Sequence, residues 1–122
     1  MFVHLRLHTE FSVVDGTNRI DEVVASAAAD GQGALAITDL SNLFGAVKFY
    51  QAARSKGVKP LLGAELLLAG PDGATPSRIV LLVQSTQGYL NLSELLARAW
   101  TRSASKTQAV ASWEWLQELG DG

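Results

Sequence analysis

Ala34-Leu35-Ala36-Ile37 is a short, unbroken apolar run, and it stops at Thr38-Asp39. Such a run is typical of a strand that is buried on both faces in a parallel sheet. Gly31 and Gly33 precede the run and end a helical pattern, which indicates that a helix leads into this strand. Strands that alternate with helices define the α/β fold class. We therefore expect an α/β fold.

A strand and a helix are predicted before this run. Residues 2–8 alternate by position, with apolar side chains on one face and His4, Arg6 and His8 on the other, which is the period of a strand. Apolar residues then recur at helical spacing from Ile20 to Ala28, after Thr17 and Asn18, which can cap a helix. The order strand, helix, strand follows from these two patterns.

Further elements are predicted after the run. A second helix is expected over roughly residues 43–56, with Gly57 as its C-terminal cap. Residues 59–69 and 78–83 are expected to form a hairpin around the turn-rich residues 70–73. A helix over about residues 88–100 and a short amphipathic piece near Trp113 complete the pattern.

Composition limits the classes to which the chain can belong. The chain has 122 residues, of which 48% are hydrophobic, so we expect one globular domain with a core. It has no cysteine, which excludes disulfides and thiolate metal sites and suits a reducing cytoplasm. No signal peptide and no membrane span are recognisable. The formal net charge of −2 argues against a domain that grips DNA phosphates by itself.

Four side chains could meet at the carboxyl ends of the predicted strands. His8, Asp39 and Glu65 fall at or near strand ends, and Asp15 lies in the loop after the first strand. Working side chains of parallel α/β folds lie at the carboxyl ends of strands. One His with three carboxylates would suit Mn, Mg or Zn. Asp-Gly is also a common turn and Asp a common capping residue, so each position has a structural interpretation as well.

The two histidines argue against a complete metal site. His4 and His8 would be about 13 Å apart along a strand that rises about 3.3 Å per residue, too far for one ion. The position that would form a His-x-His pair with His8 is Arg6, which is always charged and has no lone pair to donate. We expect His4 to be a partly exposed residue at the strand end.

Several motifs occur in an order that resembles one protein family. Residues 4–16, HLRLHTEFSVVDG, resemble the first motif of PHP domains, in the form found at the start of bacterial DNA polymerase III alpha subunits. Residues 34–45 with 47–50 look like the second motif, residues 57–65 like the third, and residues 88–92 like the segment after the fourth strand. The similarity spans nearly the whole chain.

The resemblance implies a fold and an ancestral activity. It implies a distorted seven-stranded β/α PHP barrel, of which residues 1–122 would be a partial, truncated N-terminal domain. The rest of the barrel and the polymerase domains would lie beyond the C-terminus. Active members of the family gather three metal ions and hydrolyse phosphoesters.

Carried over residue by residue, the resemblance implies a degenerate metal site. Three positions keep a metal ligand: His8, Asp15 and Glu65. Three positions have lost theirs: Arg6, Leu40 and Arg78, with Asp39 a neighbouring residue of the second motif. We therefore expect no metal in this segment, and we expect Arg6 and Arg78 to neutralise the remaining carboxylates.

The resemblance also implies a role in DNA replication. The segment would be a structural module of the catalytic alpha subunit that docks the proofreading exonuclease, beside other replicase subunits. The parent would be a cytoplasmic bacterial DNA-directed DNA polymerase, a nucleotidyltransferase that uses magnesium and contacts DNA. No catalytic residue of that reaction is expected in this segment. The alternative is an active PHP domain, a metal-dependent phosphoesterase or 3′-5′ exonuclease.

Truncation of a barrel gives a last expectation. A sheet cut after about four strands exposes an unpaired edge and an apolar face. Association of two copies would cover both, so the isolated segment is expected to form a homo-oligomer.

Overall fold

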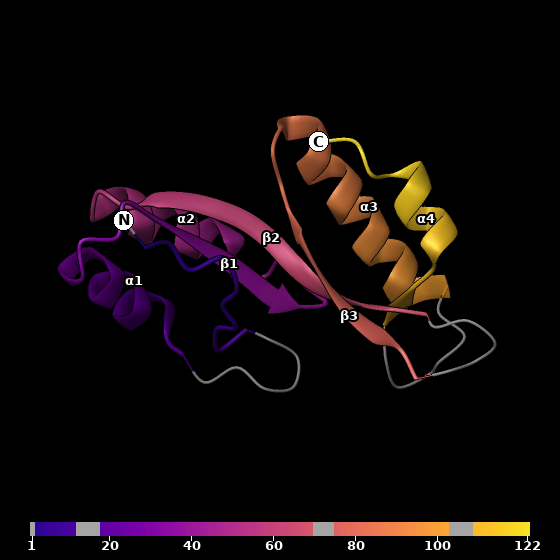
Figure 1. The fold of residues 1–122 in the computed structure, drawn as a ribbon, viewed down its shortest axis with the longest axis horizontal. Coiled ribbons are helices and arrows are strands. Elements are labelled where there is room, and N and C mark those ends of the chain that lie inside the picture. The colour runs from indigo at the N-terminus through magenta and orange to yellow at the C-terminus, as the bar shows by residue number, and fades with distance from the viewer. Residues whose placement is uncertain (1, 12–17, 70–74, 103–108) are drawn as a thin grey trace.

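The structure is a computed structural model, and it describes residues 2–11, 18–69, 75–102 and 109–122. Helices and strands alternate along most of this chain (Figure 1). The elements, in order, are α1 (Ile20–Ala29), β1 (Ala34–Leu40), α2 (Ala46–Ser55), β2 (Lys59–Leu68), β3 (Ser77–Leu82), α3 (Thr86–Arg102), β4 (Val110–Ala111) and α4 (Trp113–Glu118).

β2 is the strand that every other strand of the described sheet contacts. β1 pairs with it in parallel, from Ala34 opposite Lys59 to Leu40 opposite Glu65. β3 pairs antiparallel along the other edge, and β4 adds a short parallel pairing near the end of β2, at Leu67 and Leu68. Figure 1 shows β2 as the long strand that connects the two halves of the molecule. These pairings confirm the α/β class and the hairpin of residues 59–69 and 78–83.

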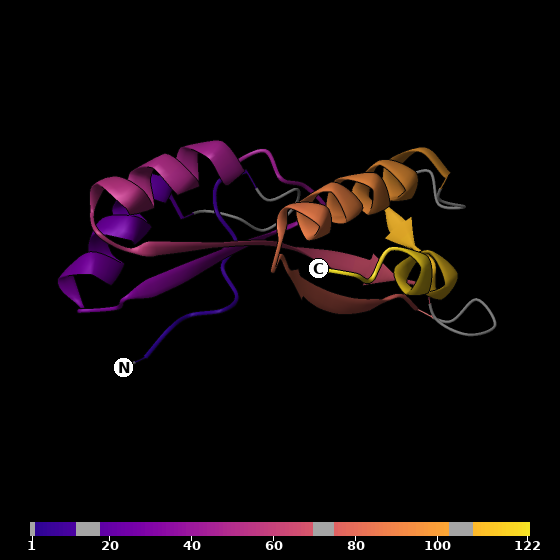
Figure 2. The same cartoon turned by 90° about the horizontal axis from the view of Figure 1, so that it is seen from above.

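The helices lie mainly on one side of the sheet. Figure 2 shows α2 and α3 above the same face, while the N-terminal residues start on the opposite side. α4 lies beside α3 in both views. Trp115 and Leu116 of α4 pack against the core beneath α3, so the short C-terminal piece folds back onto the domain.

Two hydrophobic clusters form the core. The first lies between α1, β1 and α2, around the fully buried Phe49. The second lies between β2, α3 and β4, and Leu95 is one of its most buried residues. β2 contributes to both, because Leu62 packs against the first cluster whereas Ala64 and Leu66 belong to the second.

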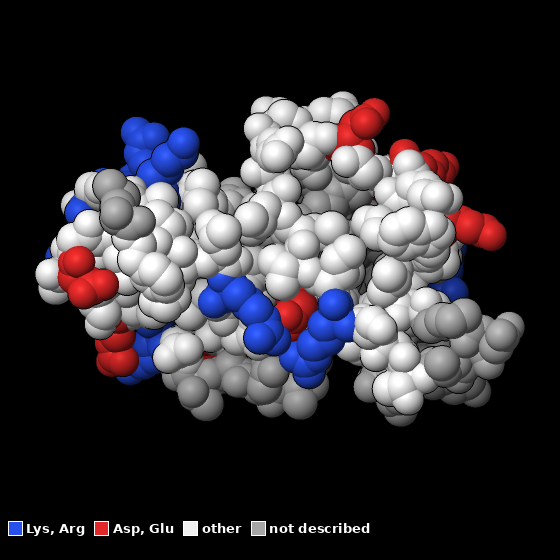
Figure 3. Space-filling model, in the orientation of Figure 1, with Lys and Arg blue, Asp and Glu red and all other residues white. Residues whose placement is uncertain are grey.

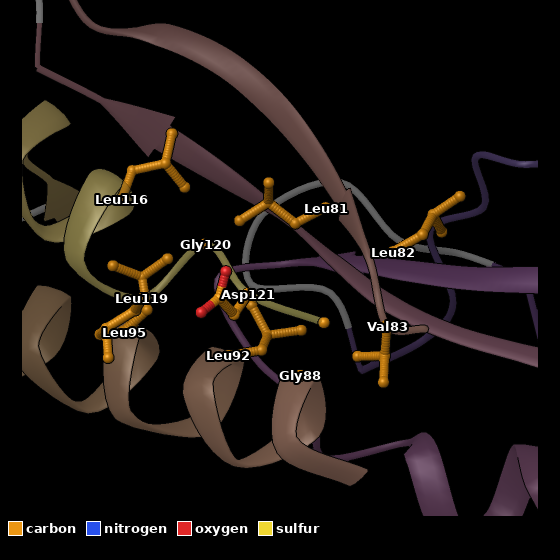
Figure 4. Close-up of a pocket in the computed structure, with 11 residues that line it drawn as sticks. Leu81, Leu82, Val83, Gly88, Leu92, Leu95, Leu116, Leu119, Gly120 and Asp121 are labelled. Atoms are coloured by element: carbon orange, nitrogen blue, oxygen red, sulfur yellow. The ribbon is translucent and has the colours of Figure 1, made fainter. Parts of the chain in front are cut away.

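A small hollow lies inside the second cluster. It measures about 70 Å³ and opens between β3, α3 and the C-terminal residues (Figure 4). Leucines from three elements surround it: Leu81 and Leu82, Leu92 and Leu95, and Leu116 and Leu119. Because its walls are mainly hydrocarbon, it offers little chemistry.

Residues 2–8 do not form the regular strand that was predicted for them. Residues 2–8 do lie along β1, and Ala36 N donates to His4 O at 3.0 Å while Thr38 N donates to Leu7 O at 2.9 Å. The three-residue step from His4 to Leu7 therefore lies opposite the two-residue step from Ala36 to Thr38. A regular ladder needs equal steps on both strands, so the segment stays irregular.

Two predicted boundaries are also corrected. β1 does not stop at Thr38-Asp39 but continues to Leu40, because β2 keeps pairing with it as far as Glu65. Asn18 does not cap α1: the N-cap is Arg19, without a side-chain cap, and the Asn18 amide donates to His8 O instead. Thr17 lies outside the described residues.

The remaining helices match their patterns with shifted ends. α2 begins at Ala46 rather than at residue 43, and Gly57 after it has a φ of 74°, as expected for a C-terminal glycine. α3 is longer than predicted, and its buried residues include Leu92, Leu95 and Leu96. Within the described residues no helix is both long and apolar enough to span a membrane.

Candidate functional site

Glu65 is the acidic residue at the centre of the candidate site. It lies on β2, and only 1% of its surface is exposed. Its partner in the parallel register is Leu40, the last residue of β1, and its antiparallel partner is Val80 of β3. The carboxylate therefore lies where β1 ends, which is the edge that parallel α/β folds use for chemistry.

Basic side chains from two distant segments surround the Glu65 carboxylate. Arg6 Nε donates to Oε1 at 2.6 Å, and Arg78 Nη1 donates to Oε2 at 3.1 Å. His8 Nε2 lies 2.8 Å from Oε2, which is an ion pair when the ring is protonated. We call Arg6, His8, Glu65 and Arg78 the Glu65 cluster.

The Glu65 cluster is buried at its centre and open at its rim. The Glu65 side chain is 2% exposed, whereas those of Arg6 and Arg78 are 60% and 44% exposed. Figure 3 shows basic side chains on both sides of an acidic group near the middle of this face. The arginines thus cover the carboxylate and keep their own charge partly in solvent.

The arginines and His8 keep Glu65 ionised. Burial by itself raises the pKa of this carboxyl, but the hydrogen bond from Arg6, the charges of His8 and Arg6, and the hydrogen bond from Arg78 outweigh it. The net effect is a pKa below the usual value. Glu65 is therefore a carboxylate at neutral pH.

Hydrogen bonds of Leu7 and Thr9, which lie next to Arg6 and His8, hold the N-terminal segment in place. Leu7 N donates to Thr38 Oγ1 at 2.8 Å, in addition to the bond that Leu7 O accepts from Thr38 N. Two residues further, Thr9 N and Thr9 Oγ1 donate to the two carboxylate oxygens of Asp39, the hydroxyl at 2.7 Å. Thr9 and Asp39 are both buried. Asp39 therefore fixes the position of the N-terminal segment, which carries Arg6 and His8.

The other predicted site residues lie as follows. Leu40 is buried and places hydrocarbon on the strand end beside Glu65. His4 is exposed, and its ring packs edge-on against Phe2 with 4.6 Å between ring centroids, in agreement with its expected exposure. Asp15 falls outside the described residues.

The comparisons with known proteins identify the family. Residues 4–122 match the PHP domain. The chain belongs to the PHP family. Curated relatives include DNA polymerase III alpha subunits from Pseudomonas aeruginosa, 42% identical over 99% of this chain, from Neisseria meningitidis, 45% over 98%, and from Escherichia coli, 38% over 99%. The chain spans only about a tenth of the length of these relatives.

Solved structures agree with a PHP-type fold. An amidohydrolase from Chromobacterium violaceum, solved with bound sulfate and no metal, aligns with a TM-score of 0.65 and 26% identity over 80% of this chain and 32% of its own. A protein from Bifidobacterium adolescentis that is described as a metal-dependent phosphoesterase aligns with a TM-score of 0.63 and 23% identity over 80% of this chain and 32% of its own. The second likeness supports the fold alone.

The described residues do not fit the metal cluster of an active PHP domain. Guanidinium groups hold both oxygens of Glu65, and a cation beside a ligand repels a metal ion. Leu40 has no donor atom. Among the residues that the structure describes, no three His, Asp or Glu side chains gather into a group that could hold a metal ion.

Sequence reasoning missed part of the framework around this PHP site. Thr9 was not singled out, although it is the buried partner of Asp39. Ser41 has a φ of 61°, and its carbonyl accepts a 2.7 Å hydrogen bond from Trp100 Nε1. A left-handed backbone is uncommon for a residue other than glycine. The Ser41-Asn42 pair after the strand, two short polar residues, is the signal that could have indicated this turn.

Proposed function

We propose that this chain is the N-terminal PHP segment of the alpha subunit of a bacterial DNA polymerase III. The relatives named above support the proposal, since they match 98–99% of the chain and are all alpha subunits. In this proposal the described sheet is the first part of a distorted seven-stranded β/α barrel. The parent is a cytoplasmic DNA-directed DNA polymerase that uses magnesium, and it contacts DNA through its other domains.

Within that parent, the segment is a metal-free structural module that docks the proofreading exonuclease subunit. One observation supports the loss of catalysis most directly: the Arg6 and Arg78 guanidinium groups occupy both oxygens of the buried Glu65. A metal ion at this carboxylate would first have to displace two charge-assisted hydrogen bonds. The ion pairs stabilise the retained carboxylate in the place of a metal.

An active metal-dependent phosphoesterase or 3′-5′ exonuclease is the second candidate. The name of one structural neighbour, an amidohydrolase that is 26% identical, favours a hydrolytic enzyme. The side chains at this site favour the first proposal, because Arg6, Leu40 and Arg78 cannot coordinate a metal ion. The two candidates differ in metal content and in hydrolysis.

We expect the purified PHP segment to contain no stoichiometric transition metal and to hydrolyse no phosphate ester. Elemental analysis after incubation with Mn²⁺ and Zn²⁺ measures the first property, and a generic phosphate monoester measures the second. The variant R6H/L40H/R78H serves as control, since it restores ligand types and is expected to take up metal weakly. Two or three equivalents of metal in the unchanged protein would contradict the proposal.

The docking role is tested with the intact subunit. Purified full-length alpha subunit and its proofreading exonuclease should form a complex in size-exclusion chromatography. The same polymerase with a PHP domain from an unrelated stand-alone phosphoesterase in place of its own should not bind. Equal binding by the exchanged protein would place the docking site outside the PHP domain.

We also expect the isolated 122-residue chain to self-associate. β3 is paired only along its β2 edge within the described sheet, and Leu82 at its end is 38% exposed. A second copy can pair with such an edge and cover the apolar side chains beside it. Light scattering across a concentration series measures this. A monomer at the highest concentration would show that the chain protects this edge by itself.

A further inference from the structure

α2 presents an exposed apolar stripe that the Glu65 cluster does not use. Phe44, just before the helix, is 76% exposed, Val47 is 67% exposed and Tyr50 is 44% exposed. Val47 and Tyr50 are three residues apart and so lie on one face of the helix, and Phe44 lies two residues before its first residue. Single exposed apolar residues are ordinary, but these three lie close together in the sequence at the start of α2.

A groove runs beside this stripe, between α2 and the start of α3. Its volume is about 310 Å³, and its lining combines Val47 and Tyr50 of α2, Leu62 of β2 and Tyr89 of α3. Figure 2 shows that both helices lie above the same face of the sheet. Leu90, 56% exposed, follows Tyr89. Space of this size accommodates one or two large side chains of a partner.

The charged residues of α2, which borders the groove, are all basic. α2 contains Lys48 and Arg54 and no acidic residue. Lys48 lies 3.5 Å from Glu10, so its charge is partly offset. The Arg54 guanidinium lies 5.7 Å from the centroid of the Tyr50 ring, and its Nη1 donates to Tyr50 Oη at 3.3 Å. The first residues of α3, Thr86–Asn91, carry no charge. The groove therefore has a largely apolar lining, with the positive charge of Arg54 beside it at Tyr50.

We propose that this groove binds a peptide segment whose apolar side chains are flanked by Asp or Glu. The apolar side chains would enter between Val47, Leu62 and Tyr89, and a carboxylate would meet Arg54. Charge complementarity selects this chemistry, because a basic segment would face the Arg54 charge. The inference rests on the proposed function, in which the segment belongs to the proofreading exonuclease.

The same charges argue against a second copy of this chain in the groove. A two-fold interface brings the same surface of both copies together. Arg54 of one copy would then lie in the same interface as Arg54 of the other, and α2 contributes no acidic residue that could offset the two charges. Self-association through β3 uses a different surface and is independent of this groove.

The experiment measures binding between full-length alpha subunit and its exonuclease by fluorescence anisotropy. Val47→Asp should weaken the complex by roughly thirtyfold, because it places a carboxylate in the apolar contact. Arg54→Glu should weaken it by about tenfold and reduce its dependence on salt, while Arg54→Lys should bind as the unchanged protein does. Trp113→Asp on α4, whose side chain is 56% exposed, is the matched control and should leave binding unchanged.

Labelling shows whether the exonuclease covers the groove. Val47→Cys should react quickly with a maleimide in the alpha subunit alone and slowly in the complex. Slow reaction in the subunit alone would show that its own later domains cover the groove, which overturns the inference. Normal exonuclease binding by both Val47→Asp and Arg54→Glu overturns it too, but leaves the proposed function standing. An unchanged subunit that binds no exonuclease overturns both.

Discussion

Replacing Arg6 and Arg78 together by leucine is expected to lower the free energy of unfolding by about 3 kcal/mol, because it leaves a buried carboxylate without its two guanidinium partners. The Glu65 side chain is 2% exposed, so solvent replaces the lost hydrogen bonds only in part. His8 would remain near one carboxylate oxygen and limit the loss. Urea denaturation at neutral pH measures the change.

The acid response should distinguish the two proteins further. The unchanged protein has a folded pKa for Glu65 below its unfolded value of about 4.3, so this stabilisation is complete above that pH and is lost as the pH falls through the lower folded pKa. In the double variant burial would dominate and raise the folded pKa, so acidification would stabilise it. The difference in stability should therefore shrink from pH 7 to about pH 4.

A further variant serves as the control for this prediction. Adding Glu65→Leu to the double variant removes the uncompensated charge and should recover most of the lost stability, because buried ion pairs can often be replaced by apolar residues of similar volume. A triple variant as unstable as the double one would mean that the arginines act through packing of their side chains and not through charge.

Phe49→Ala is expected to destabilise the fold by about 3–5 kcal/mol, since it removes the largest fully buried side chain of the chain's first cluster. Phe49 lies between α1 and β1, so its loss leaves a cavity that two elements border. Phe44→Ala removes the same ring from a position that is 76% exposed and should change the stability by no more than about 0.5 kcal/mol. Thermal and urea unfolding of the two variants, side by side, measure both effects. Similar losses in both would mean that the Phe44 stripe packs against something in solution.

Local patterns predicted most of the elements. The helix from Ile20, the apolar run at Ala34 and the hairpin after Gly57 each have their signal within about ten residues, and the structure has all three. The alternation of residues 2–8 gave the wrong answer for a reason that lies outside the segment. A strand requires a partner with matching steps, and the mismatch with β1 at His4 and Leu7 is not visible in the segment itself.

The site was predictable only in part. No period connects Arg6 with Glu65, 59 positions apart, and their pairing was expected from the PHP resemblance alone. Thr9 and Asp39, 30 positions apart, and Trp100 and Ser41, 59 positions apart, had no such guide. Long-range hydrogen bonds of this kind depend on how the elements pack, which single-sequence patterns do not encode.

Because β2 packs against both hydrophobic clusters, we expect the domain to open to solvent in separate parts. The first half of β2 packs against the cluster around Phe49 and its second half against the cluster around Leu95. We expect each cluster, with the helices that cover it, to be a separate cooperative unit, and β2 contributes to both. Amide protons of α1 should then exchange with solvent through openings that leave α3 protected, and the reverse should hold for α3. Those in the middle of β2, around Gly63 and Ala64, should exchange last, because both units have to open before solvent reaches them.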